Sequence, residues 1–524
     1  MKAFETFVGL GDYLGRRAIY SPDAPAFVDA GKAEPLRLTF AEADLRATRV
    51  AAALRQLGVG AGDRVALLGR DGIEHLDGFF ACAKLGALHT PLNWRLHWRE
   101  NLAILKRLEP RALLFGSDFA AAVADMRATG ELGAARLAHL DGEPVADSLA
   151  VAEWLATPAP DFAPTPVQPE DIAALIFTGG TTGTPKAAAI SHRQIAWNAL
   201  NTVIHDLRHG DRYLNAFPLF HTGGLFVYTA PLALLGGTTV LTRQFDAAQT
   251  LDLIARERIT VFAGVPTMYQ MMTAAPNWPM ADLSSLRFCT SGGAPLPLTL
   301  IETYRAEKGV CFKQGFGMTE FGPGVFALAP EDAERKSGSI GRPNFFIEAA
   351  VVDDGGAPLP PDAEGELVLR GPAGSSGYFG DERATAASRD AAGWFHTGDI
   401  ARYDAEGFFF IVDRKKDMFI SGGENVYPAE IEQALHAHPA VAMCAVVGVP
   451  DPKWGEVGAA CVVLKPGATA TEAEILAFLR ERLASYKTPK SAHFFDALPM
   501  SAAGKILKRD LRARLARPSA EKSD

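Results

Sequence analysis

The 524-residue chain lacks the features of a secreted, membrane-spanning or nucleic-acid-binding protein. Its five cysteines form no CxxC pair, so neither a disulfide framework nor a zinc knuckle is indicated. The apolar runs are too short to span a bilayer, and Glu5 and Asp12 interrupt the N-terminal stretch where a secretory signal needs an apolar core. Lys plus Arg is 52 and Asp plus Glu is 61, which gives a net charge of −9 and argues against a sequence-independent nucleic-acid binder. We therefore expect a cytoplasmic protein that acts on small molecules.

Several common catalytic motifs are also missing. Gly315 and Gly317 are not followed by the third glycine of GxGxxG, so a Rossmann dinucleotide site is not indicated. The Gly-rich loop that ends in Lys186 has no adjacent Gly-Lys pair and is not a Walker sequence. No GxSxG occurs, which removes the usual elbow of a serine hydrolase. His205 and His209 are spaced for one helix face, but no catalytic Glu lies between them, which disfavours a zinc site.

The pattern of apolar segments predicts an α/β fold. Residues 42–57 have helical spacing, and short buried strands are expected at 112–115, from 172, at 260–263 and at 286–289, as in a large, multi-layered α/β domain. Between 336 and 412 the pattern changes to short β-like runs, including 366–369 and 408–412. A compact α+β tail follows, with helices at 429–436 and 472–483, strands at 441–449 and 457–464, and a basic helix after Gly504. We predict a large domain over residues 1–413 and a small one over 414–524.

The strongest local signal is the string from Phe177 to Lys186, FTGGTTGTPK. It contains three glycines and four threonines, and it follows a strand that we expect to be buried. Such a loop turns successive backbone N–H groups and hydroxyls towards one anion. The Lys186 ammonium adds a positive charge for outer phosphates. The string therefore predicts a phosphate-binding loop.

At this string the chain resembles the adenylate-forming superfamily of acyl- and aryl-CoA synthetases, luciferases and peptide-synthetase adenylation domains. It departs from the usual YTSGTTGxPKG form at Phe177, Gly179 and Ala187; the glycine at 179 removes one hydroxyl donor but leaves the backbone cradle. Six further matching segments follow in the family order, at 291–297, 314–320, 393–399, 413–417, 421–428 and 499–505. The resemblance implies a small C-terminal domain that is mobile. It also implies that a carboxylate attacks the α-phosphorus of ATP, after which a thiol, usually that of coenzyme A, displaces AMP.

The resemblance implies a role for each matching residue. Those implied to be catalytic are Lys186, His221, Thr319 and Lys505. Those implied to bind the nucleotide are Thr178, Gly179, Gly180, Thr181, Thr182, Gly183, Gly292, Gly293, Ala294, Phe316, Gly317, Asp399 and Arg414. Glu320 is the implied ligand of Mg²⁺, a hard cation that prefers carboxylate oxygen. Lys416 is the implied hinge of the small domain, and Gly422 and Gly423 are where coenzyme A would pass close to the backbone.

In this scheme Lys505 bridges the carboxylate and the α-phosphate, to which Thr319 also donates. Asp399 accepts the ribose hydroxyls with support from Arg414, and Phe316 stacks on adenine. The acid would lie near His221, residues 265–267, 292–293 and 321–324, strings that hold no other charged side chain, so an apolar acid is expected.

Because the residues around Gly324 are small, we favour a medium- or long-chain fatty acid, with an aryl acid as the alternative. Two other classes stay open: an adenylating enzyme that loads a carrier protein, and an inactive binding protein of the same fold.

Overall fold

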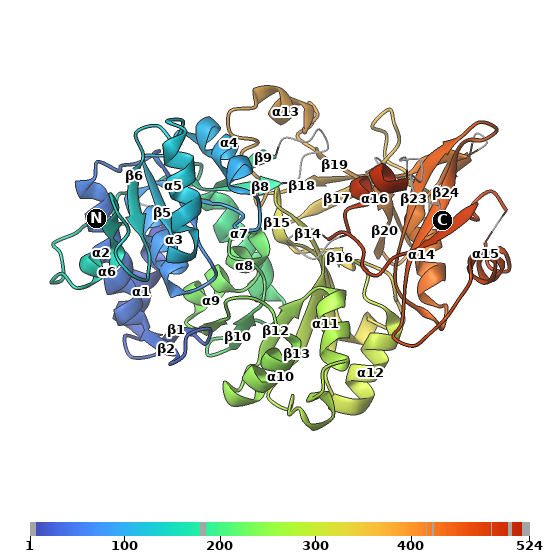
Figure 1. The fold of residues 1–524 in the computed structure, drawn as a ribbon, viewed down its shortest axis with the longest axis horizontal. Helices are drawn as coiled ribbons and strands as arrows, with labels where there is room; N and C mark the ends of the chain where they lie inside the picture. Colours follow the sequence, from blue (N-terminus) through green and yellow to red (C-terminus); the bar gives the residue numbers. More distant parts are fainter. Residues whose placement is uncertain are drawn as a thin grey trace, which may run out of the picture. The chain divides into compact units, whose positions relative to one another are not determined.

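The computed structural model describes residues 7–178, 185–414, 417–421, 424–483, 485–500 and 506–515. The chain divides into two compact units. Unit 1 comprises Met1–Ser337, Pro343–Glu348 and Arg370–Gly393, and unit 2 comprises Gly338–Arg342, Ala349–Leu369 and Trp394–Asp524. The fold is therefore α/β with a large N-terminal and a smaller C-terminal part, as the sequence indicates (Figure 1). The domain boundary between residues 413 and 414 stays a prediction.

Unit 1 is built around two sheets, which we call sheet A and sheet B. In spatial order, sheet A contains β16 (Arg342–Pro343), β15 (Gly322–Leu328), β14 (Phe312–Met318), β13 (Phe288–Gly292), β12 (Val261–Gly264), β10 (Arg212–Asn215), β11 (Thr238–Leu241), β1 (Pro25–Asp29) and β2 (Leu36–Thr39). Sheet B contains β7 (Leu149–Ala150), β6 (Arg136–His139), β5 (Ala112–Phe115), β3 (Arg64–Leu68), β4 (Leu88–Pro91), β8 (Ile172–Thr178) and β9 (Lys186–Ser191). The central strands pair in parallel and read as continuous apolar runs, because both faces of such a sheet are covered.

Helices cover both sheets of unit 1. They are α1 (Tyr13–Tyr20), α2 (Phe40–Gln56), α3 (Ile73–Leu85), α4 (Trp98–Leu108), α5 (Ala120–Ala128), α6 (Val151–Leu155), α7 (His192–Ile204), α8 (Thr222–Phe226), α9 (Thr229–Leu235), α10 (Ala247–Arg256), α11 (Pro266–Thr273), α12 (Leu298–Lys308) and α13 (Glu382–Ala387). In Figure 1, α10, α11 and α12 lie beside β12 and β13 of sheet A. Among the residues that the structure describes, no helix combines the length and apolarity needed to cross a membrane.

Helix α3 is buried along its whole length, although it carries charged side chains. Its apolar residues share one core with β1 of sheet A and β8 of sheet B. The Asp77 carboxylate accepts from Arg46 at 2.6 Å, and the Lys84 ammonium donates to Asp44 at 2.6 Å, with both partners on α2. Pairing of this kind is what allows charges inside a protein. The two helices therefore pack with a fixed register.

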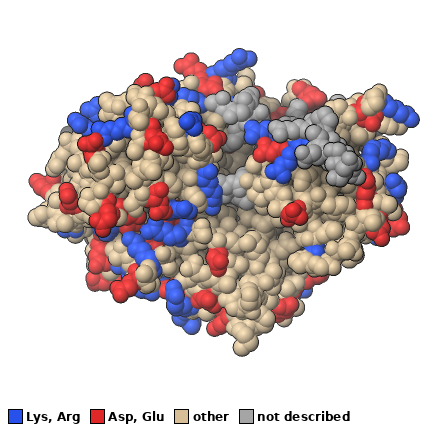
Figure 2. All heavy atoms as spheres, viewed as in Figure 1, with Lys and Arg blue, Asp and Glu red and all other residues tan. Residues whose placement is uncertain are grey.

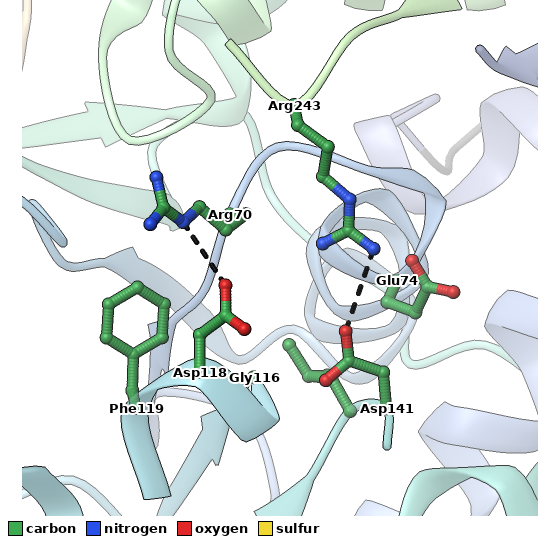
Figure 3. A pocket seen from close by; sticks show the side chains of 8 residues that line it. Arg70, Glu74, Gly116, Asp118, Phe119, Asp141 and Arg243 are labelled. Atoms are coloured by element: carbon green, nitrogen blue, oxygen red, sulfur yellow. Dashed lines mark hydrogen bonds and ion pairs between the residues drawn. The ribbon is translucent and has the colours of Figure 1, made fainter. Parts of the chain in front are cut away.

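The topology of sheet B places a crevice at the carboxyl ends of its strands. Strand β3 pairs with β4 on one side and with β5 on the other. The chain goes from β3 to β4 and then crosses to β5, so the boundary between β3 and β5 is a topological switch point. A small pocket lies where these strands end. Figure 3 shows Arg70 directed at Asp118 and Arg243 directed at Asp141 inside it, at 3.4 and 3.8 Å. None of the residues lining this pocket was predicted as a site residue.

Unit 2 contains two smaller sheets. The first contains β17 (Glu348–Val352), β18 (Gly365–Arg370), β19 (Phe395–Tyr403) and β20 (Phe409–Arg414). The second contains β22 (Glu424–Val426), β21 (Phe419–Ser421), β24 (Gly455–Leu464), β23 (Val441–Asp451) and β25 (Ser491–Phe494), with helices α14 (Pro428–His436), α15 (Glu472–Arg480) and α16 (Lys508–Leu515). An α+β tail is thus confirmed.

Most predicted elements are found within two residues of their expected ends. The expected helix at 472–483 ends earlier, at Arg480. His205 and His209 do not share a helix face, because α7 ends at Ile204 and His205 is its C-terminal cap. On the face shown in Figure 2, cationic and anionic side chains are interspersed.

The core of sheet B gives a test of this packing. Leu113 lies fully buried on β5, so Leu113→Ala should leave a cavity and lower the free energy of unfolding by ~2–5 kcal/mol. Leu149 is the matched control because it is 40% exposed on β7. Leu149→Ala should change the free energy of unfolding by less than ~0.5 kcal/mol. Urea titrations followed by far-UV circular dichroism measure both. Equal losses in the two variants would contradict the packing described here.

Candidate functional site

The predicted phosphate loop joins two antiparallel strands. Strand β8 ends at Thr178 and β9 begins at Lys186, and these two residues are register partners. The Thr178 hydroxyl donates to the Lys186 carbonyl oxygen at 3.4 Å. Residues 179–184, which include the predicted Gly179, Gly180, Thr181, Thr182 and Gly183, lie outside the described residues. The structure therefore fixes the two ends of the loop, and the loop opens from a hairpin rather than from a helix N-terminus.

Tyr378 connects Lys186 to Glu320. The segment before Tyr378 runs alongside β9: the Ala189 N–H donates to the Gly377 carbonyl at 2.8 Å, and Ala188 pairs with Tyr378. The Lys186 ammonium lies 5.0 Å from the centre of the Tyr378 ring, within reach of a cation–π contact. On the other side, the Tyr378 hydroxyl donates to Glu320 Oε1 at 2.7 Å. Lys186 and Glu320 thus lie around one aromatic ring.

This hydroxyl stays a donor over the ordinary pH range. Burial, and then the charge of the Glu320 carboxylate, raise the pKa of Tyr378 well above its usual value. Sequence reasoning missed Tyr378, because its partners are 58 and 192 residues away. The available signal was an aromatic hydroxyl between two glycines, Gly377 and Gly380, which both have positive φ.

Thr319 and Glu320 lie in the turn that follows β14, and both are 8% exposed. The Gln194 side-chain amide donates to the Thr319 carbonyl at 3.2 Å, and the Ser375 N–H donates to the Glu320 carbonyl at 2.6 Å. The backbone of the turn is therefore fixed from α7 and from the segment before Tyr378. Gln194 was not predicted either, because α7 is remote from this turn in the sequence.

The Glu320 carboxylate fits a cation that shares its other ligands with a bound anion. No group of three or more His, Cys, Asp or Glu side chains suited to a metal occurs in the part of the chain that the structure describes. A dedicated transition-metal site would need such a group. Mg²⁺ instead keeps several waters and binds through one or two carboxylates plus phosphates. One buried carboxylate held by a neutral donor is compatible with that mode.

The predicted nucleotide segments meet on neighbouring parallel strands. Gly292 of β13 is the register partner of Gly315 on β14. A Cβ at Gly292 would lie 3.1 Å from the Gly315 carbonyl oxygen, and one at Gly317 would lie 2.4 Å from Pro323 backbone atoms. Phe316 packs edge-to-face on Phe326 of β15, with ring centres 5.8 Å apart. These glycines are required by close backbone packing, at the carboxyl ends where parallel sheets bind ligands.

The adjoining turn is accessible. Gly293 and Ala294 are exposed, and Gly293 has φ +82°, which favours glycine. Within the described residues, the Ser291 hydroxyl and the Gln314 amide nitrogen are buried without a hydrogen-bond partner. Buried polar atoms without partners are uncommon in folded proteins, and a water, an ion or a ligand can supply the missing partner.

His221 is the N-cap of α8. Its Nδ1 accepts from the Gly223 N–H at 3.2 Å, so the neutral imidazole carries its proton on Nε2. The loop before it is closely packed, because a Cβ at Gly224 would lie 2.3 Å from the Pro218 carbonyl oxygen. Asn215 donates to the Gly224 carbonyl at 3.0 Å and closes the same loop. His221 thus presents an N–H donor from a fixed turn.

In unit 2, strand pairing brings Asp399 and Arg414 together. Asp399 on β19 is the register partner of Arg414 on β20 and is 3% exposed. Its N–H donates to the Thr397 hydroxyl at 3.0 Å. The Arg414 side chain lies outside the described part of the chain, as do the predicted residues Lys416, Gly422, Gly423 and Lys505.

The chain is similar to known proteins along nearly its whole length. The model of the AMP-binding enzyme family matches residues 14–379, and that of the AMP-binding enzyme C-terminal domain matches residues 430–505. A feruloyl-CoA synthase of Amycolatopsis sp is 44% identical over 97% of this chain and 99% of its own. The long-chain-fatty-acid–CoA ligase FadD13 of Mycobacterium tuberculosis is 37% identical over 96% of this chain and 98% of its own. The crystal structure of the anthranilate CoA ligase AuaEII in complex with anthranoyl-AMP superposes with a TM-score of 0.90, at 30% identity, and covers 98% of this chain and 99% of that chain.

Tyr378→Phe tests the contact with Glu320. The variant removes the hydroxyl that donates to a charged acceptor, so the free energy of unfolding should fall by about 1.5–3 kcal/mol. Tyr304→Phe is the control, because the Tyr304 hydroxyl donates to a neutral backbone carbonyl at 3.0 Å and should cost only about 1 kcal/mol. Urea unfolding at pH 7 measures both. A Tyr378→Phe variant as stable as the wild type would show that Glu320 does not need this donor.

Proposed function

The chain belongs to the AMP-binding enzymes, the adenylate-forming superfamily, and from this membership we propose that it is an AMP-forming carboxylic acid:CoA ligase for aryl acids. The observation that carries the proposal is the connected set of Lys186, Tyr378 and Glu320 beside a Gly/Thr loop. This set offers one cation to phosphates and one carboxylate to a phosphate-bound cation. It occurs in a chain that matches CoA ligases along nearly its whole length.

The first step would be adenylation. The acid carboxylate attacks the α-phosphorus of ATP, a P–O bond forms, and pyrophosphate leaves. The loop at 178–183 and Lys186 would hold the outer phosphates, and Thr319 would donate to the α-phosphate. The His221 Nε2–H would hold the acid carboxylate, while Lys505 would bridge that carboxylate and the α-phosphate. Each donor stabilises charge that develops on oxygen in the transition state.

The cation and nucleotide contacts are those that the family resemblance implies. Glu320 would hold Mg²⁺, which when bound neutralises charge on the phosphates. Asp399 would accept both ribose hydroxyls with Arg414 beside it, a role that its burial and strand pairing support. Phe316 would cover one face of adenine and residues 292–294 the other.

The second step would transfer the acyl group to a thiol. The sulfur of coenzyme A attacks the acyl carbon, the C–S bond forms, and AMP leaves with the C–O pair of electrons. Gly422 and Gly423 would let the pantetheine arm pass close to the backbone, and Lys416 would be the hinge between the two steps.

An aryl acid now has more support than the fatty acid that the sequence favoured. The small residues around Gly324 predict room for a longer chain. In the structure its N–H donates to Asn198 Oδ1 at 3.1 Å, and a Cβ there would lie 3.3 Å from that oxygen. The glycine is therefore explained by packing against α7 and needs no long acid. The feruloyl-CoA synthase and the anthranilate ligase are named for aromatic acids. A fatty acid stays the second candidate because of the similarity to FadD13.

An activity panel tests the proposal. Purified protein, ATP and MgCl₂ are incubated with hydroxycinnamic, benzoic, arylacetic and C8–C16 fatty acids, with and without coenzyme A. We expect pyrophosphate, AMP and an aryl-CoA thioester to form in equal amounts. If thioester formed only with the fatty acids, a fatty acid would replace an aryl acid as the proposed substrate. If every reaction with coenzyme A released pyrophosphate but formed no thioester, a carrier protein would become the proposed acceptor in place of coenzyme A.

Lys505→Ala separates the two half-reactions. The variant loses the bridging cation of adenylation, so acyl-AMP formation should fall by at least ~10²-fold. Thioester formation from supplied acyl-AMP should stay near the wild-type rate. The control is Lys490→Ala, which removes an exposed lysine of unit 2 and should leave both rates unchanged. Equal loss of both half-reactions in Lys505→Ala would refute the role of this lysine in adenylation.

A further inference from the structure

Asp71 is a buried carboxylate that holds the loop before His221. It lies between the end of β3 and the start of α3, at the switch point of sheet B, and is 6% exposed. Its Oδ1 accepts from the Leu219 N–H at 2.8 Å, across 148 residues of sequence. Leu219 belongs to the turn that follows β10 of sheet A, two residues before His221. One side chain of sheet B thus fixes a turn of sheet A.

Three arginines act on the same carboxylate through their charge. Arg70, Arg95 and Arg243 all exert a favourable charge interaction on Asp71. Arg70 and Arg243 are the two cations of the pocket in Figure 3, where they also pair with the exposed or half-buried acids Asp118 and Asp141. Their pairing with Asp118 and Asp141 is loose, at 3.4 and 3.8 Å, so these arginines are not fixed by those partners alone.

Two of these arginines also lie against the aromatic side chains next to the loop. The Arg70 and Arg95 guanidinium carbons lie 4.0 and 4.5 Å from the centre of the Trp94 ring. Trp94 in turn meets the Phe220 ring edge-to-face, with centres 6.5 Å apart, and Arg95 lies 5.8 Å from that ring. Phe220 directly precedes His221. Asp71 therefore holds the loop through a direct hydrogen bond, while Arg70, Arg95 and Trp94 form a wall against Phe220.

The hydrogen bond and the wall depend differently on charge. The hydrogen bond from Leu219 needs only an acceptor oxygen, which a protonated carboxyl also offers. The two guanidinium groups beside the Trp94 ring carry like charges, and a negative charge at Asp71 offsets their repulsion. Burial raises the pKa of Asp71 to about 7, against the opposing effect of the Leu219 N–H and the three arginines. The charge at this position therefore changes in the neutral range.

We propose that Asp71 is a positioning residue for acid binding, which anchors the Leu219–His221 turn and, by its charge, supports the packing of Trp94 on Phe220, the residue before His221. The inference rests on the proposed function, since it is His221 that would hold the acid. It predicts that the acid binds more tightly when Asp71 is ionised, and that this dependence does not extend to ATP.

Asp71→Asn separates the hydrogen bond from the charge, because the amide oxygen still accepts from Leu219 but carries no charge. At pH 8 we expect KM for the acid to rise about five- to tenfold, because a charge interaction is lost while the hydrogen bond is kept, with KM for ATP unchanged. In the wild type, KM for the acid should rise as the pH falls through about 7, and in Asp71→Asn this change should be absent. Asp118→Asn is the control: it removes a 60% exposed carboxylate that also contacts Arg70, and it should behave as the wild type.

A readout without substrate keeps the test independent of turnover. The fluorescence difference between the wild type and Trp94→Phe, titrated with pH, reports the surroundings of Trp94. It should show a midpoint near 7 that Asp71→Asn lacks. A wild type without that midpoint would overturn the proposal, and so would an Asp71→Asn variant in which KM for acid and for ATP rise equally. If no acid is turned over by the wild type, the proposed function fails, while the fluorescence titration still decides the role of Asp71.

Discussion

The site depends on the backbone pairing of β9. This strand pairs antiparallel with β8 on one side, which closes the phosphate loop between Thr178 and Lys186. On its other side it accepts the segment before Phe379, which places the Tyr378 ring against Lys186 and its hydroxyl on Glu320. The segment around Tyr378, which is far from β8 and β9 in the sequence, is thereby aligned with them by main-chain hydrogen bonds. A shift of one residue in either pairing would turn Tyr378 or Lys186 to the opposite face.

This explains which parts of the site the sequence predicted. Strand β8, the loop and Lys186 are contiguous, and local composition alone is enough to predict a phosphate-binding loop there. Thr319, Glu320 and the glycines of β13 and β14 came from segments matched to a family. Tyr378 and Gln194 were missed, since their roles arise from a pairing register and from the docking of α7, which no local pattern encodes. The roles of Asp399, Lys416 and Lys505 stay predictions, as does the boundary between the two domains.

The fold was more predictable than the substrate for a similar reason. A parallel strand buried on both faces, such as Ala112–Phe115, is visible as an apolar run, and its ends were predicted without error. The ends of α15 and α7 were less visible, because helix termini depend on caps more than on apolar spacing. A glycine can be required for several structural reasons, and a sequence does not distinguish them. At Gly324 the nearest neighbour is Asn198, and a Cβ there would make a tight contact with its side-chain oxygen.

Burial of acids in this protein lowers the free energy of unfolding by an amount that depends on pH. Burial raises the pKa of Asp71 to about 7 and that of Asp77 to about 6, from an ordinary value of 3.8. The native state therefore binds these protons more tightly than the unfolded chain, so both groups reduce stability as the pH rises from about 4 to 7. Below that range both states are protonated and there is no cost; above it the cost is complete. Asp77 offsets part of this cost through its contacts with Arg46, which join α2 to α3. Asp71 has its only short donor in Leu219 among the hydrogen bonds described, so its retention in a core is explained best by the turn that it holds.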